Sequence, residues 1–213
     1  QRYVKALETG HTNELLKTLG EGVDVNCMIG QTPAIFTLGA KAPTHIFRLM
    51  MEAAEDIGLD INRRYFEDQY GLIHLLCSNP PMIENAKILF EYGEKVKLDV
   101  NLYSRTGSTP LSVSVCNNNV DCVMLLVENS ERLGLNPNLQ SSWGNTPLII
   151  ACGEGHFAVF EYLLDNAEKL HLDLNIKDQN GNTALDILKM FHPDIRSSHE
   201  LLESLGGKSG KDI

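Results

Sequence analysis

Four stretches of the chain share one pattern of apolar positions. Apolar residues stand at positions i, i+3, i+4 and i+10 of each stretch, and polar residues fill most of the gaps. This spacing puts the apolar side chains on one face of a helix. They are Phe47, Met50, Met51 and Ile57, then Ala86, Leu89, Phe90 and Val96, then Val123, Leu126, Val127 and Leu133, and last Phe160, Leu163, Leu164 and Leu170. We therefore expect four amphipathic helices that pack in a stack, because no single helix pair can bury such a face alone.

The segments between these helices repeat a second pattern. Leu98–Leu111 returns without a gap at Leu135–Leu148 and again at Leu172–Leu185, after 37 residues each time. Less regular copies are found at Val23–Ala34 and Leu59–Ile73. The recurring asparagines are Asn26, Asn62, Asn101, Asn138 and Asn175. A repeat at a fixed period of this size is typical of a solenoid.

Each repeat also predicts where a first helix begins. Thr stands at positions 32, 109, 146 and 183, and its hydroxyl can accept a hydrogen bond from an amide of the first helical turn. Pro follows at positions 33, 110 and 147, where its missing N–H costs nothing. The pattern thus predicts a polar turn, a first helix capped by Thr, and the amphipathic second helix.

These motifs resemble those of the ankyrin repeat family. Thr-Pro-Leu opens helices at Thr109–Leu111 and Thr146–Leu148, Gly-His precedes the second helix at Gly10-His11 and Gly155-His156, and Asp-Val-Asn recurs at Asp99–Asn101 and at 24–26. The resemblance covers nearly the whole chain. It implies an all-α solenoid of five to six repeats, each with a β-turn finger followed by two antiparallel helices.

The resemblance also sets the expected boundaries. One ankyrin repeat domain should span 1–205, with repeats at roughly 1–25, 26–61, 62–100, 101–137, 138–174 and 175–205, and a flexible tail should follow at 206–213. The distance from Gly155 to Asn175 is four residues longer than that from Gly10 to Asn26. We expect those residues to lengthen some second helices by about one turn.

Composition and charge argue against some classes of binding partner. The chain is 43% hydrophobic and carries a formal net charge of −10, so it lacks the basic footprint that nucleic acid or an anionic membrane requires. No apolar run approaches the length of a membrane span. We expect a monomer that binds no nucleic acid, no membrane and no cofactor.

The cysteines bear on the cellular compartment, and the first residue bears on whether the chain is part of a longer protein. The five cysteines form no CxxC pair, which favours a reducing compartment, the cytoplasm or alternatively the nucleus. The chain shows no signal-peptide pattern, and it begins with Gln1 rather than Met. We therefore expect it to be part of a longer protein.

The fingers supply the candidate binding residues. The resemblance implies a protein or peptide partner on the concave face formed by the fingers and the first helices. Interfaces favour Trp, Tyr and Arg, and the arginines could dock an acidic partner segment. The candidates are Arg64, Tyr65, Phe66, Tyr103, Arg105 and Trp143.

Other functions receive less support from the sequence. No HExxH, GxSxG or paired Cys/His spacing occurs, so we expect neither an enzyme nor a metal site. The chain could instead recruit substrates within a larger enzyme, a ligase subunit or a secreted bacterial effector. The resemblance also implies a role as a substrate, because the repeat asparagine can be hydroxylated in this family. Besides Asn26, the candidate positions are Asn62, Asn101, Asn138 and Asn175.

Overall fold

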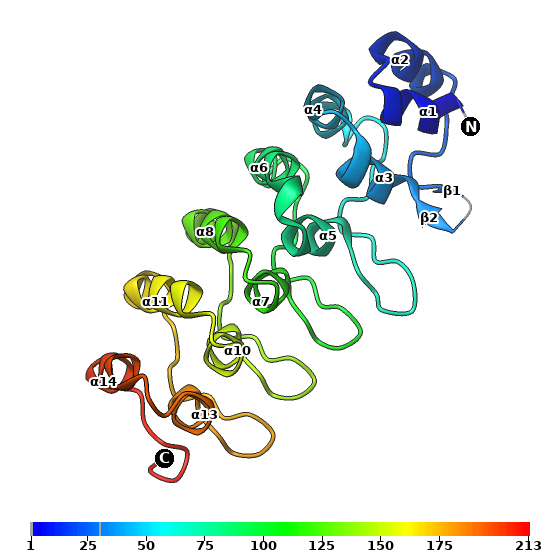
Figure 1. The fold of residues 1–213 in the computed structure, drawn as a ribbon. Helices are drawn as coiled ribbons and strands as arrows, with labels where there is room; N and C mark the ends of the chain where they lie inside the picture. The colour runs from blue at the N-terminus through cyan, green and yellow to red at the C-terminus, as the bar shows by residue number, and fades with distance from the viewer. Residues whose placement is uncertain (1, 30) are drawn as a thin grey trace.

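The first helices of the repeats form an inner row along the molecule. The computed structural model describes residues 2–29 and 31–213. Figure 1 shows the inner helices one after another along the stack, and each contacts the next. They are α1 (Arg2–Thr9), α3 (Ala34–Lys41), α5 (Leu72–Ser78), α7 (Pro110–Cys116), α10 (Pro147–Glu154) and α13 (Ala184–Phe191). Gln1 and Gly30, which fall within the predicted repeats 1–25 and 26–61, lie outside the described residues.

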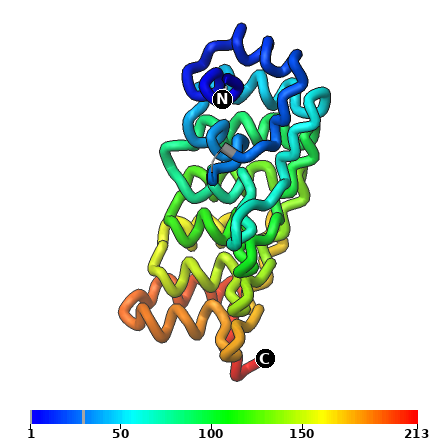
Figure 2. Tube along the Cα trace, turned by 90° about the vertical axis from the view of Figure 1, so that its right-hand side faces the viewer, coloured from blue at the N-terminus to red at the C-terminus, as the bar shows by residue number. Residues whose placement is uncertain are grey.

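The second helices form an outer row behind the first. Figure 2, a view turned by 90°, shows an elongated stack with the first and last repeats at opposite ends. The outer helices are α2 (Thr12–Gly20), α4 (Thr44–Ala53), α6 (Ile83–Glu91, preceded by the 3-10 turn η1, Pro80–Met82), α8 (Val120–Glu128), α11 (Phe157–Asp165) and α14 (Arg196–Ser204). The predicted all-α solenoid is confirmed.

The core follows the predicted apolar stripe. The first three residues of each stripe are buried between the two rows, and Phe47, Phe90 and Phe160 are among the largest fully buried side chains. Of the fourth residues, Leu170 is buried, and Ile57, Val96 and Leu133 pack partly buried against the core. One continuous hydrophobic cluster therefore joins all the repeats.

Threonine caps three of the four helices for which the sequence predicts a cap. Thr109, Thr146 and Thr183 each accept a hydrogen bond from the amide three residues ahead. The prediction for Thr32 is wrong. The short finger there pairs β1 (Met28–Ile29) with β2 (Thr32–Pro33), and Ile29 is the ladder partner of Thr32. Thr32 therefore belongs to the antiparallel strand pair, and α3 begins at Ala34 without a side-chain cap.

The predicted extra helical turns are present, but they do not lengthen the outer helices continuously. After α8 and α11 the chain breaks for one residue and forms the separate short helices α9 (Ser130–Leu133) and α12 (Ala167–Leu170). The break residues Asn129 and Asn166 donate through their side-chain amides to the carbonyl four residues back, at 2.7 and 2.9 Å. This local bonding competes with the helical ladder, so asparagine at these positions explains the break.

His74 holds the start of α5, where the Thr-Pro cap is missing. Its Nδ1 accepts a hydrogen bond from the amide of Gly71 at 3.1 Å, and its Nε2 donates to the carbonyl of Ser108 at 3.1 Å. Burial lowers the pKa of the imidazole. The neutral ring therefore serves a structural role that ties the third finger and helix to the fourth finger.

The repeat asparagines join each repeat to the next. The side-chain amide of Asn101 donates to the carbonyl of Gly134 at 2.8 Å, and its oxygen accepts from the amide of Asn136 at 2.8 Å. Asn26, Asn62, Asn138 and Asn175 make the same pair of bonds to the residues equivalent to Gly134 and Asn136. In every pair the accepting carbonyl belongs to a left-handed residue that ends the outer segment, namely Gly58, Lys97, Gly134, His171 or Gly206. We refer to these paired bonds as the asparagine ladder.

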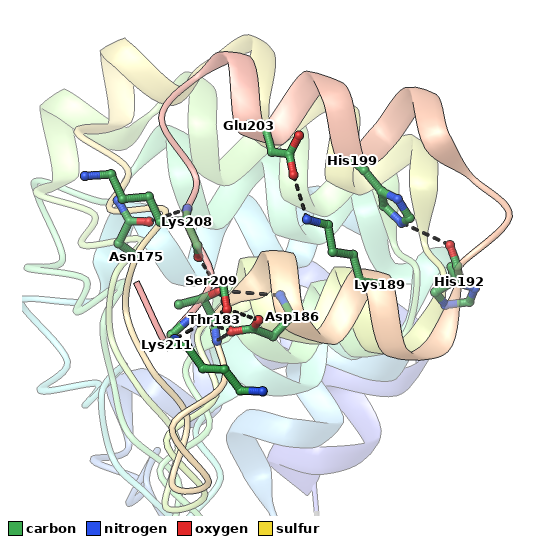
Figure 3. Close-up of polar contacts among 11 residues, drawn as sticks. Asn175, Thr183, Asp186, Lys189, His192, His199, Glu203, Lys208, Ser209 and Lys211 are labelled. Carbon is green, nitrogen blue, oxygen red and sulfur yellow. Dashed lines mark hydrogen bonds and ion pairs between the residues drawn. The ribbon is translucent and has the colours of Figure 1, made fainter. Parts of the chain in front are cut away.

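The C-terminal segment, which the sequence predicts to be a flexible tail, packs against the last repeat (Figure 3). Asn175 holds it through Gly206 and Lys208, at 3.1 and 2.8 Å. The carboxylate of Asp186 accepts from the Ser209 hydroxyl at 2.7 Å and from the amide of Gly210 at 2.6 Å. The prediction is therefore wrong for 206–210, because the segment takes the place that the next repeat would occupy on the ladder.

The hydrogen bonds to the Asp186 carboxylate should make the free energy of unfolding depend on pH in the acid range. Burial raises the pKa of this carboxyl, but the hydrogen bonds from Gly210, Thr183 and Ser209 outweigh burial and hold the pKa at about 2. Because the folded pKa lies below the unfolded value of about 3.9, the contribution is present above about pH 4 and is lost as the pH falls towards 2. We expect it to be about 1–2 kcal/mol, less than the full pKa difference would give, because solvent screens this partly exposed carboxylate.

The measurement is the free energy of unfolding in urea between pH 5 and 2.5 for the wild type and Asp186→Asn. The variant should be less stable at pH 5 and should lose less stability on acidification. The pKa of Asp178 is also lowered, so the difference between the two proteins isolates Asp186. Asp165→Asn, an exposed change on α11, serves as the control. Parallel pH profiles for wild type and Asp186→Asn would contradict the prediction.

Candidate partner-binding surface

The fingers form a row beside the inner helices. The amide of Arg105 donates to the carbonyl of Asp68 at 2.8 Å, that of Ser142 to Thr106 at 2.9 Å, and that of Gln179 to Trp143 at 3.2 Å. Each of these bonds joins one finger tip to the next. The third to sixth fingers are therefore held in register and present a continuous edge.

Two glycines let neighbouring finger tips approach closely. Gly107 and Gly144 have φ values of +72° and +78°, which side chains rarely adopt. A Cβ at Gly107 would lie 2.7 Å from the amide nitrogen of Ser142, and one at Gly144 would lie 2.7 Å from that of Gln179. The spacing between fingers thus depends on the absence of a side chain at both positions.

Two predicted binding residues of the third finger differ in their exposure to solvent. Phe66 is 49% exposed, but Tyr65 is only 6% exposed. Both rings pack edge-on against Phe36 of α3, with ring centroids 5.5 Å (Tyr65) and 5.6 Å (Phe66) from that of Phe36, and the guanidinium of Arg63 lies over the Tyr65 ring at 5.4 Å. Tyr65 therefore packs within the protein, and the prediction that it contacts a partner is wrong. Phe66 stays available.

The other predicted residues lie on the exposed edge of the fingers. Arg64 and Arg105 are exposed, Tyr103 is 39% exposed and Trp143 is 58% exposed. Arg64 donates to the carbonyl of Tyr103 at 3.3 Å, which joins the third finger to the fourth. The structure thus brings Arg64 and Tyr103 together, and it places Trp143 farther along the row.

Three hollows lie between the fingers and the inner helices, with volumes of about 440, 290 and 460 Å³. The first and second share Tyr70, and the second and third share Trp143, Asn145, Ile150 and Glu154. We call this continuous surface the finger groove. Its further apolar lining comprises Phe36, Phe66, Leu75, Val113, Ile149, Ile187 and Phe191. Such a concave, partly apolar surface can hold an extended chain.

Sequence reasoning missed Tyr70 and the part of the groove that comes from helices. Tyr70 ends the third finger, whereas Ile150 and Glu154 belong to α10 and Phe191 ends α13. One signal was present in the sequence, because Ile149 and Ile150 are adjacent apolar residues in a helix and only one of them can face the core. Ile149 is 4% exposed and reaches only the third hollow, whereas Ile150 is half-buried and lines both the second and the third.

Another hollow, with a volume of about 700 Å³, lies on the first repeat. It is lined by α1, α2 and the residues between them, and it shares no residue with the finger groove. It involves no finger, whereas the three hollows of the finger groove share lining residues and form one surface, so the candidate site is the finger groove.

Two other kinds of site are missing from residues 2–29 and 31–213. None of the helices has the length and apolar character that a membrane crossing requires. In the same ranges, no three side chains of His, Cys, Asp or Glu come together as metal ligands would.

Comparison with known proteins agrees with the repeat geometry. The family model described as ankyrin repeats (three copies) matches residues 73–178 and 130–192, together more than half of the chain. No curated protein matches the sequence. The crystal structure of EF0377, an ankyrin repeat protein, superposes with a TM-score of 0.74 at 19% identity, covering 95% of this chain and 96% of that one. At this identity the likeness shows the shared fold.

Proposed function

Because the chain belongs to the ankyrin repeat family, whose members are generally protein–protein interaction modules, we propose that it binds a partner protein or peptide along the finger groove. The observation that carries this proposal is the row of three connected hollows beside the exposed side chains of Phe66 and Trp143. A module that recruits substrates for a larger enzyme would use the same surface, and the identity of the partner would distinguish the two roles.

The two aromatic side chains are the expected anchors. Exposed large aromatics next to a hollow are the residue type that dominates binding energy at interfaces. Phe66 lies at the first hollow, and Trp143 lies where the second and third meet. A partner that covers both would therefore reach from the third repeat to the fifth.

Binding should depend on these anchors. We expect the double variant Phe66→Ala/Trp143→Ala to weaken binding of a partner by about 30-fold or more, because each anchor contributes about 1–2 kcal/mol or more. The experiment is affinity capture on immobilised wild-type chain, followed by measurement of the dissociation constant for each captured partner. Trp143 is the one tryptophan of the chain, so its fluorescence reports burial of the groove directly.

The control is Met124→Ala, which removes an exposed apolar side chain from α8 in the outer row. Circular dichroism must show that all variants are folded. Equal affinity of the wild type and the double variant for the captured partners would exclude the finger groove as their site.

A further inference from the structure

The charged groups that line the finger groove all have the same sign. Asp68, Glu154 and Asp178 contribute carboxylates, and among the described residues no Lys, Arg or His lines any of the three hollows. Burial raises the pKa of Asp178, but hydrogen bonds from Asn182 and Asn180 outweigh it and keep the pKa below its usual value. The groove therefore carries negative charge at neutral pH.

Glu154 occupies the centre of this surface. It lines both the second and third hollows together with Trp143. It is exposed, and it belongs to none of the ion pairs formed among the described residues. It is also the last residue of α10, where the helix end carries partial negative charge. A carboxylate beside an exposed indole is a favourable site for a cation.

The arginines of the third and fourth fingers do not offset this negative charge within the groove. Arg63 lies over the ring of Tyr65, and Arg64 donates to the carbonyl of Tyr103. Arg105 lies on a finger and lines none of the hollows. The expectation that arginines dock an acidic segment thus concerns the finger edge, and the groove has the opposite preference.

Building on the binding role proposed above, we propose that the groove recognises an extended peptide segment in which a Lys or Arg is flanked by apolar residues. The cation lies over the face of Trp143 and beside the carboxylate of Glu154, which combines a cation–π contact with an ion pair. The neighbouring apolar side chains enter the hollows on either side, against Ile150 and Phe191. The shared lining of the second and third hollows makes this one connected site.

The test uses a random-peptide display library panned on the wild-type chain. Enriched peptides are synthesised with a fluorescent label, together with versions in which the Lys or Arg becomes Gln or Glu, and anisotropy measures their dissociation constants. The protein variants are Glu154→Lys and Trp143→Ala. The control Glu131→Lys makes the same charge change at an exposed residue of α9. A native circular dichroism spectrum is required of each.

We expect enriched peptides to contain a cation next to apolar residues. Glu154→Lys should weaken them by about 10-fold or more and Glu131→Lys by less than about 2-fold, and the Glu version of a peptide should regain affinity for Glu154→Lys. Neutral or acidic peptides that lose binding in Trp143→Ala would overturn this inference and leave the binding role intact. No enrichment, or peptides that bind Trp143→Ala and Glu154→Lys as tightly as the wild type, would overturn both.

Discussion

Replacing Gly144 by alanine is expected to lower the free energy of unfolding by about 3 kcal/mol, whereas the same change at Gly181 should cost about 1 kcal/mol. Both glycines occupy the same place in their fingers and have similar φ values, +78° and +82°. They differ in what lies beside them. A Cβ at Gly144 would lie 2.7 Å from the backbone nitrogen of Gln179, but nothing lies within 4 Å of a Cβ at Gly181. Only Gly144→Ala must therefore push two fingers apart.

Urea unfolding followed by circular dichroism measures both costs, and the difference between the two variants removes the backbone strain that they share. Because Trp143 precedes Gly144, displacement of this finger should also weaken binding to the groove. Similar destabilisation by the two substitutions would show that the backbone approach between fingers has no energetic consequence.

Asn101→Ala should destabilise the protein by about 2–3 kcal/mol, and Asn175→Ala by about 1 kcal/mol. Asn101 lies in the middle of the asparagine ladder, and its loss leaves the carbonyl of Gly134 and the amide of Asn136 without their partners. Asn175 makes the same two bonds, but only to the C-terminal segment. The first variant therefore weakens contact between two large parts of the stack, and the second releases a short segment.

Urea unfolding gives the two stabilities, and hydrogen exchange locates the change. Asn101→Ala should speed exchange at the amide of Asn136, and Asn175→Ala should do so at that of Lys208. If Asn101→Ala cost less than about 0.5 kcal/mol, water would be replacing the side chain adequately and the ladder would not be a stabilising element.

The sequence predicted the features that depend on neighbouring residues in the chain. The caps at Thr109 and Thr146 were predictable because the hydroxyl and the amide that it accepts from lie three residues apart. The apolar stripes predicted the buried residues for the same reason, since a helix sets their direction.

Features that depend on another repeat were not predictable in this way. Burial of Tyr65 requires the ring of Phe36, which belongs to a different repeat. The C-terminal segment is ordered by Asn175 and Asp186, more than 20 residues away. Glu154 gains its place in the groove only because α10 brings it beside the hollows on either side of Trp143. The segment 206–213 is polar and rich in glycine, and for that reason it was predicted to be flexible, although its hydrogen-bond partners Asn175 and Asp186 lie in the same chain.

The closed end of the asparagine ladder bears on self-assembly. Stacked repeats could in principle continue from one molecule into the next and form head-to-tail fibres, since a heterologous contact of this kind need not close. Here Gly206 and Lys208 already fill both bonding positions of Asn175. Counted from the left-handed Gly206, the next ladder position is taken by Gly210, which has no side chain to offer, and a Cβ there would overlap the carbonyl oxygen of Gly181. A second molecule could therefore pair with Asn175 through the ladder only after displacing this segment.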